Sequence, residues 1–150
     1  MRVRSVRTYA LRTELAEPFG WRVHTTPIRQ AVLVEVETDD GLVGWGEAGS
    51  GTLPRVEAAF VDEVLAPVVA GEDPFNLARI WEKVRSAFDR AGWDVGLSVQ
   101  AFSGLEMALW DLMGRAAGRP VSQLLGGRGP GASRRLRHGA VLLPGPGRSV

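Results

Sequence analysis

The order of two hydrophobic periodicities is the feature that most limits what this chain can fold into. Up to about residue 47 apolar side chains tend to alternate with polar ones, whereas from about residue 54 they recur at helical spacing. Residues 2–13 alternate imperfectly, and residues 30–47 predict a hairpin that turns at Asp39-Asp40-Gly41. Strands followed by helices predict an α+β fold, in which an antiparallel sheet is covered on one side by helices.

Capping residues indicate where the helices begin and end. The first helix is expected to have Thr52 as its cap and Pro54 in its first turn, and to run to about Val69. The second is expected to open at Asp73-Pro74, with the aspartate as N-cap, and to end near Gly92.

A third helix is expected to begin around Gly96 or Ser98 and to end at Gly118, before a short helical turn. Small residues along it predict that another helix or strand packs closely against it; they are Ala101, Ser103, Gly104 and Ala108. In the return strand of the hairpin, Gly44 and Gly46 indicate either a bulge or a close backbone approach.

Two stretches fit neither periodicity. Residues 14–27 contain Pro18, Gly20 and Pro27, and we expect a loop of about a dozen residues there. A second irregular stretch runs from Ala48 to Leu53. Long loops inside compact domains are often functional, so these stretches are the first places to look for a site.

The composition excludes several kinds of site and partner. The chain has no cysteine, which rules out disulfides, thiolate metal sites and cysteine nucleophiles. Its net charge of +1 gives no attraction to nucleic acid or to an anionic membrane, and no apolar run approaches the ~18 residues of a membrane span. All 17 acidic residues lie between Glu14 and Asp111, and the arginines that follow lack the interleaved aromatics of a nucleic-acid arm. We expect a cytoplasmic protein.

Single charged side chains give little evidence of chemistry. Glu106 and Asp111 are five residues apart, about 140° around a helix, so they are not expected to share a site. Asp111 and Arg115 have the spacing of a favourable helical pair. Lys83, the only lysine, is expected on a solvated helix face, and Glu47 in a structural hydrogen bond.

The third expected helix and its continuation, AFSGLEMALWDLMGRAAGRPVSQLLG, resemble a signature of the mandelate racemase/muconate lactonizing enzyme branch of the enolase superfamily. The matching positions are Ala101, Ser103, Gly104, Leu105, Glu106, Ala108, Leu109, Asp111, Gly114, Arg115, Pro120, Val121, Leu124, Leu125 and Gly126. Two further stretches, VLVEVETDDGLVGWGEA and LAPVVAGEDPFNLARIWEKV, resemble strands and helices of the same family.

The resemblance runs from about residue 2 to residue 127 and implies the N-terminal capping domain of such an enzyme. That domain is a three-stranded antiparallel meander followed by a helical bundle. We therefore expect one domain at residues 1–127. Residues 128–150 would be a Gly/Pro/Arg-rich tail, either the start of a truncated barrel domain or the product of a frameshift.

The resemblance also implies chemistry that needs groups outside this chain. The family abstracts a proton α to a carboxylate and stabilises the product with Mg²⁺, using a base and acidic ligands on the strands of a (β/α)₈ barrel. Such a barrel takes roughly 200 residues or more. Only 23 residues follow Gly127, and they include no Asp, Glu or Lys. We therefore assign no catalytic residue and no metal ligand here. Mg²⁺ is expected only in the full-length enzyme, and whether this chain counts as an enzyme is left open.

The loops of the capping domain are where substrate contacts are expected. In relatives two loops close over the barrel mouth, exclude water and set substrate preference. The matching stretches are Ala16–Pro27 and Ala48–Leu53. The candidate substrate-binding residues in them are Phe19, Trp21, His24, Ser50 and Thr52. The alternatives are that the two aromatic residues only anchor their loop, and that the histidine is exposed and has no role.

The function that the resemblance implies is that of a capping and specificity domain. The parent would be a Mg²⁺-dependent racemase, epimerase or acid-sugar dehydratase. Acid-sugar dehydratase-like and mandelate racemase-like groups rank ahead of dipeptide epimerases. The partners would be a small carboxylate substrate, reached through a barrel domain, and further copies in a homo-oligomer. The alternative is a stand-alone, non-catalytic dimerisation domain derived from that family.

Overall fold

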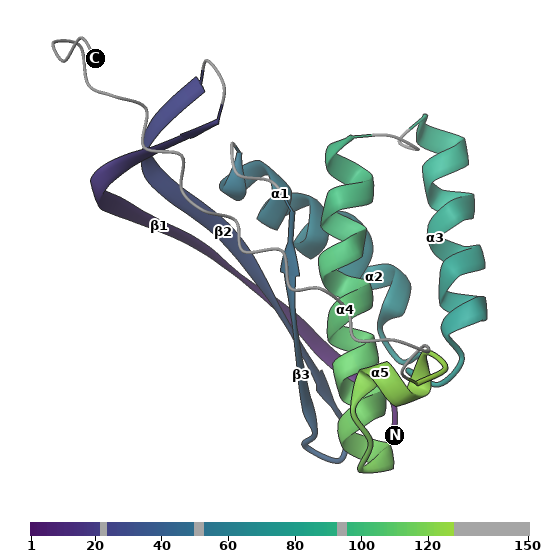
Figure 1. Ribbon diagram of the computed structural model, residues 1–150. Coiled ribbons are helices and arrows are strands. Elements are labelled where there is room, and N and C mark those ends of the chain that lie inside the picture. Colours follow the sequence, from purple (N-terminus) through teal and green to yellow (C-terminus); the bar gives the residue numbers. More distant parts are fainter. Residues whose placement is uncertain (22–23, 50–52, 93–95, 128–150) are drawn as a thin grey trace, which may run out of the picture. The chain divides into compact units, whose positions relative to one another are not determined.

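The computed structural model describes residues 1–21, 24–49, 53–92 and 96–127, and it shows strands followed by helices (Figure 1). The strands are β1 (Val3–Trp21), β2 (His24–Thr38) and β3 (Val43–Ala48), which form one sheet in the order β1-β2-β3. The helical segments are α1 (Pro54–Phe60), the π-helical η1 (Val61–Leu65), α2 (Ala66–Val69), α3 (Leu77–Ala91), α4 (Leu97–Ala117) and α5 (Val121–Leu124). This order confirms the predicted α+β fold. The predicted tail, residues 128–150, lies outside the described residues.

The described residues form two units. The first contains Met1–Leu11 and the chain from Gln30 onward, and the second contains Arg12–Arg29, where β1 and β2 approach their connection. In the second unit the structure corrects the sequence prediction. Residues 14–27 are not a loop of a dozen residues, because β1 continues to Trp21 and β2 begins at His24.

The hairpin of the second unit lacks the alternation by which strands are recognised in a sequence. None of its described side chains is buried, so no face selects apolar residues at every second position. Its prolines also fit a strand. Pro18 lies in the edge strand β1, and Pro27 precedes the β2 residues that pair with β3. Backbone pairing alone therefore makes a strand that has no period in its sequence.

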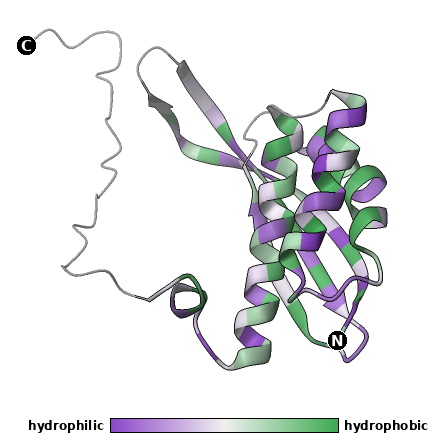
Figure 2. Cartoon of the chain, turned by 90° about the vertical axis from the view of Figure 1, so that its right-hand side faces the viewer, coloured by the Kyte–Doolittle hydropathy of each residue, from purple (hydrophilic) through white to green (hydrophobic). Residues whose placement is uncertain are grey.

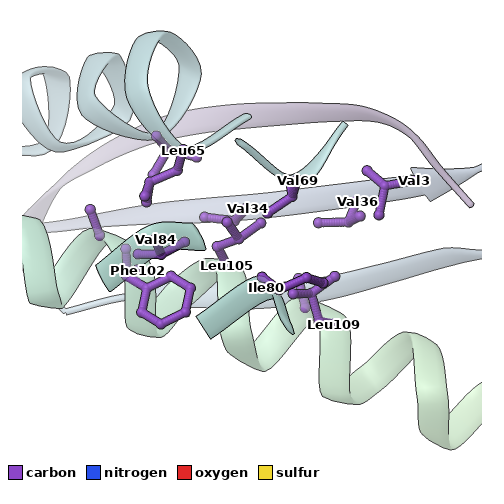
Figure 3. Close-up of a cluster of buried hydrophobic side chains, with 14 of the residues drawn as sticks. Val3, Val34, Val36, Leu65, Val69, Ile80, Val84, Phe102, Leu105 and Leu109 are labelled. Carbon is purple, nitrogen blue, oxygen red and sulfur yellow. The ribbon is translucent and has the colours of Figure 1, made fainter. Parts of the chain in front are cut away.

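The core of the first unit lies between the sheet and the helices (Figure 3). Val32, Val34 and Val36 on β2 are fully buried, as their alternation predicted. The side chains that cover them come from η1, α2, α3 and α4 and include Leu65, Val69, Ile80, Val84, Leu105 and Leu109. Each fully buried Val or Leu contributes about 1.5–3 kcal/mol to folding, so this face of β2 holds the layers together.

The first predicted helix is interrupted by a π-helical turn. It spans Pro54 to Val69 as expected, but η1 lies between α1 and α2. Pro67 at the start of α2 has no N–H to donate, which breaks the α-helical hydrogen-bond ladder there. The N-cap residue is Leu53 rather than the predicted Thr52, which itself lies outside the described residues.

The second predicted helix, α3, begins later than its capping signal indicated, and its N-cap is Asn76 rather than Asp73. Asp73 closes a turn instead: its Oδ1 accepts a hydrogen bond from the N–H of Phe75 at 2.9 Å. An aspartate side chain can bind a nearby N–H in a turn as well as at a helix start, so the local signal does not separate the two. The predicted end at Gly92 is confirmed, with φ of 69°.

The third predicted helix is α4, and both of its ends are confirmed. It begins after Gly96, with φ of 70°, and ends before Gly118, with φ of 61°. Hydrophobic and hydrophilic residues alternate along the helical ribbons (Figure 2), as expected of helices that cover a sheet with one side only. Within the described ranges, none of the helices is long and apolar enough to cross a membrane.

Candidate functional site

Strand β3 and helix α4 pack with their backbones in direct contact. A Cβ atom on Gly46 would lie 2.0 Å from the carbonyl oxygen of Gly104, and one on Gly44 would lie 2.3 Å from the carbonyl oxygen of Ala108. Cβ atoms do not approach oxygen so closely, so only glycine fits at both positions of β3. The register between β2 and β3 is uninterrupted. The close backbone approach predicted from these glycines is therefore confirmed, and the alternative prediction of a bulge is wrong.

The same contact fixes the start of the second predicted lid segment. Ala48, the last residue of β3, is 2% exposed, and a Cβ on Gly104 would lie 2.7 Å from its backbone nitrogen. At Gly49 a Cβ would meet only the Cγ of Gln100, at 3.9 Å. The packing constraint thus disappears within one residue of the strand end.

Another residue next to this segment is buried and was not singled out from the sequence. Glu57 lies in the first turn of α1, is 0% exposed, and donates its backbone N–H to the carbonyl oxygen of Leu53 at 3.0 Å. A carboxylate in the first turn of a helix is favoured by the helix dipole. Sequence analysis could not identify Glu57 as buried, because buried positions of a helix are inferred from the spacing of its apolar residues.

A carboxylate on α4 holds the edge strand β3. Asp111 Oδ2 accepts hydrogen bonds from the backbone N–H of Trp45 at 3.0 Å and from Nε of Arg115 at 2.8 Å. The predicted pair of Asp111 with Arg115 is confirmed, and the contact with β3 was missed because it joins residues far apart in the sequence. Glu106 accepts a hydrogen bond from Trp81 Nε1 at 3.0 Å, so the two acids of α4 have separate partners, as predicted.

A network of polar side chains covers the face of the sheet opposite the buried valines. The hydroxyl of Tyr9 donates to Glu35 Oε2 at 2.8 Å, and Arg7 contacts the carboxylates of Glu35 and Glu37 at 3.1 and 3.3 Å. The hydrogen bond to Glu35 raises the pKa of Tyr9 above its ordinary value, because an ionised phenol would face a carboxylate. The Tyr9 ring also packs against Trp45, with 5.7 Å between their centroids.

Lys83 is not simply solvated, as the sequence had suggested. Its ammonium group contacts the carboxylate of Glu72, which Arg79 also contacts at 3.2 Å. The hydrogen bond from Lys83 lowers the pKa of Glu72. The pairing was missed because Glu72 lies outside the helix, in the turn before α3, and not at helical spacing from the lysine.

The described carboxylates do not fit a magnesium site. Mg²⁺ takes oxygen ligands in octahedral geometry, usually from more than one carboxylate. Within residues 1–21, 24–49, 53–92 and 96–127, no group of three or more His, Asp or Glu side chains is placed to hold a metal ion. Glu35, Glu72 and Asp111 are instead bound to the phenol, cations and N–H group described above.

One candidate residue in the second unit has a defined partner. The guanidinium carbon of Arg29 lies 4.8 Å from the centroid of the Phe19 ring, within the range of a cation–π interaction. Phe19 is half-buried and Arg29 is exposed. Sequence reasoning missed Arg29, because the two residues meet only when β1 pairs with β2.

The substrate-binding role of all five candidate residues stays a prediction. Trp21 ends β1 and His24 begins β2, but their side chains lie outside what the structure describes. Ser50 and Thr52 lie entirely outside the described residues. Of the five candidates, the structure therefore places only Phe19.

Comparison with known families identifies the fold. Residues 3–126 match the family described as "Mandelate racemase / muconate lactonizing enzyme, N-terminal domain". The chain belongs to this family. Among curated relatives, D-galactarolactone cycloisomerase of Agrobacterium fabrum is 39% identical over 85% of this chain and 33% of that enzyme. A D-galactonate dehydratase family member of Streptomyces bingchenggensis is 36% identical over 69% of this chain and 25% of that protein.

Solved structures of the enolase superfamily agree with this assignment. A member from Polaromonas sp. JS666 superimposes with a TM-score of 0.75 at 30% identity, over 85% of this chain and 34% of that one. An enolase from alpha proteobacterium bal199, solved with bound Mg, gives a TM-score of 0.71 at 28% identity, over 85% of this chain and 35% of that one. The chain thus spans about a quarter to a third of the length of the family relatives it matches.

Proposed function

We propose that this chain is the capping, specificity-setting domain of a Mg²⁺-dependent racemase, epimerase or acid-sugar dehydratase that abstracts a proton α to a carboxylate. The observation that carries the proposal is the extent of the match. The family's N-terminal domain covers residues 3–126, yet the chain spans only 33% of the cycloisomerase and 25% of the dehydratase relative. By this proposal the chain alone turns over no substrate.

The role of this chain's own residues is to cover and shape a substrate pocket. The contact between β3 and α4 holds Ala48, so the lid segment that follows leaves from a rigid strand end. The hairpin unit with Phe19 supplies the second covering segment. Closing such a site excludes water, which strengthens every electrostatic contact inside it.

The remaining partners belong to the rest of the proposed enzyme. The curated relatives are named for acid sugars, which supports a small carboxylate substrate for the parent of this chain. Mg²⁺ and the general base would come from the barrel portion, since the described carboxylates of this chain are engaged elsewhere. We expect the enzyme to work as a homo-oligomer in the cytoplasm.

A fusion protein tests the proposal. The full chain is joined at Val150 to the barrel portion of the Agrobacterium cycloisomerase, which is the part beyond the third that this chain matches. We expect Mg²⁺-dependent conversion of at least one acid sugar by the fusion, and none by the chain or the barrel portion alone. Circular dichroism and calorimetric Mg²⁺ binding check that the fusion is folded. A folded, Mg²⁺-binding fusion that converts no galactarolactone, galactonate or mannonate contradicts the proposal, and so does turnover by the isolated chain.

A stand-alone dimerisation domain is the second candidate function, and apolar side chains on the surface favour it. Those exposed by 44% or more include Leu53, Val56, Val99, Met107 and Leu125. Exposed apolar surface of this kind promotes self-association. Sedimentation velocity of the isolated chain tests this candidate: a monomer at all concentrations excludes it.

A further inference from the structure

We propose that the groove between α3 and α4 is the surface through which two copies of this chain associate about a two-fold axis. In this dimer Arg85 of each copy lies against Asp89 of the other. The inference goes beyond the proposed function, which expects a homo-oligomer without naming a surface. It does not depend on the reaction, because a capping domain and a stand-alone dimerisation domain could both use this groove.

The groove has a buried aromatic floor and exposed apolar edges. Helices α3 and α4 lie side by side (Figure 1), and the hollow between them measures about 490 Å³. Phe88 and Phe102 line it and are buried, whereas Trp81 and Val99 are 42% and 44% exposed. The Trp81 ring packs edge-on against Phe102, with 4.6 Å between their centroids, so this exposed ring is held in place. Exposed apolar side chains gathered at a groove are typical of a surface that binds another protein.

Two side chains of opposite charge line the same groove. Arg85 and Asp89 are both exposed on α3, and their spacing of four residues places them on one face of the helix. Neither forms an ion pair with a described residue. An arginine that precedes the acid by four residues is in the less favourable order for pairing within a helix. Both charges are therefore available to a second molecule.

A two-fold axis brings these opposite charges together twice. When residue i of one copy contacts residue j of the other in such an interface, j also contacts i. Two α3 helices that cross antiparallel midway between Arg85 and Asp89 place each arginine opposite the aspartate of the other copy. The same crossing brings Trp81 of one copy toward Val99 of the other, because α4 begins five residues after the end of α3. The groove is thus complementary to itself in charge and in apolar contact.

Other unpaired charges in the described part of the chain do not combine these features. A second groove, lined by residues of α2 and α3, includes Glu82 and Arg90, but none of its lining side chains is a large exposed apolar group. Arg55 is exposed on α1 and lines neither groove. Exposed ion pairs contribute little by themselves, so charges without an apolar contact do not hold two chains together.

Sedimentation velocity of the full chain over a series of concentrations tests the inference. We expect a monomer–dimer equilibrium whose Kd rises roughly tenfold or more in Arg85→Glu and in Asp89→Arg, because each change places like charges opposite each other at both contacts. The double variant exchanges the two charges and should restore Kd to near the wild-type value. An equimolar mixture of the two single variants should also dimerise like the wild type, because each copy supplies the charge that the other lacks.

Matched variants outside the groove are the controls. Val99→Asp should weaken the dimer, whereas Val56→Asp should not, although Val56 on α1 is 52% exposed. Arg90→Glu reverses a charge on α3 in the second groove and should leave Kd nearly unchanged. Circular dichroism checks that each variant is folded.

Three results would overturn the inference. The first is a wild-type chain that stays monomeric at all concentrations. The second is a dimer that Arg85→Glu weakens no more than Arg90→Glu does, or that the double variant fails to restore. The third is a Val99→Asp change that destabilises the fusion protein but leaves Kd of the chain unchanged, because the barrel portion then occupies the groove. A folded fusion that converts no acid sugar contradicts the proposed function and leaves the dimer surface standing.

Discussion

The carbonyl oxygen of Gly104 on α4 lies against the backbone of Gly46 on β3, so closely that a Cβ on Gly46 would stand 2.0 Å from it. Both partners are backbone atoms in regular elements, and neither can move without disturbing a hydrogen-bonded ladder. This relationship fixes α4 on the edge strand. It also fixes the strand end from which the second proposed lid segment departs.

Substituting alanine for Gly46 should destabilise the domain strongly. The new Cβ must push strand and helix apart, and overpacking against backbone costs about 3 kcal/mol, at the upper end of its usual range. Urea denaturation measures the change. Gly49→Ala is the control, because its Cβ would meet only a side-chain atom at 3.9 Å, and it should change stability by less than about 0.5 kcal/mol. Equal losses in the two variants would show that the backbone contact is not the cause.

Replacing Asp111 by alanine should cost more than replacing its ion-pair partner. The alanine variant leaves the N–H of Trp45 without its acceptor, at a cost of about 1–2 kcal/mol for a half-exposed group. Arg115→Met removes only an exposed helical ion pair, worth about 0.2–0.5 kcal/mol. Chemical denaturation measures the free energy of unfolding of both variants. Asp111→Asn keeps an acceptor oxygen, so its loss of stability should lie between those of Asp111→Ala and Arg115→Met. A larger loss in Arg115→Met than in Asp111→Ala would refute the proposed role of Trp45.

The raised pKa of Tyr9 predicts a loss of stability in alkali. The folded protein holds the phenol proton more tightly than the unfolded chain, because Glu35 accepts it in a hydrogen bond. This contribution is fully present below the unfolded value of about 10 and disappears as pH rises through the folded value. Tyr9 is the only tyrosine, so tyrosinate absorbance reports it alone. Glu35→Gln should return the titration midpoint toward its ordinary value; an unchanged midpoint would contradict the assigned cause.

The lowered pKa of Glu72 predicts the opposite behaviour in acid. Its carboxylate is stabilised by Lys83 in the folded state, so the contribution is present above the unfolded value of about 4.3 and lost as pH falls through the folded value. Lys83→Met should therefore reduce the decline in unfolding free energy between neutral and acid pH. Arg79→Met removes the lesser partner and should reduce this decline less. The reverse order of the two variants would show that Arg79 is the main partner.

The parts of the fold that were predicted correctly depend on local or periodic information. The buried face of Val32, Val34 and Val36 follows from alternation, and the end of α3 at Gly92 follows from the backbone freedom of glycine. The start of α3 was misplaced because Asp73 makes the same hydrogen bond in a turn as at a helix start. In the candidate site, Phe19 was named from its segment, whereas its partner Arg29 was not, since the two residues lie ten positions apart on different strands.

By itself, then, the sequence determined the order of the elements, the C-terminal ends of the helices and the presence of small residues where strand and helix would meet, because each is encoded within a few neighbouring residues. Tertiary structure decided that Gly46 opposes Gly104, that Asp111 binds the N–H of Trp45, and that residues 14–21 and 24–27 continue the strands. These features depend on which distant backbones come together, and a pairing between segments that bury no side chains leaves no periodic trace in either of them.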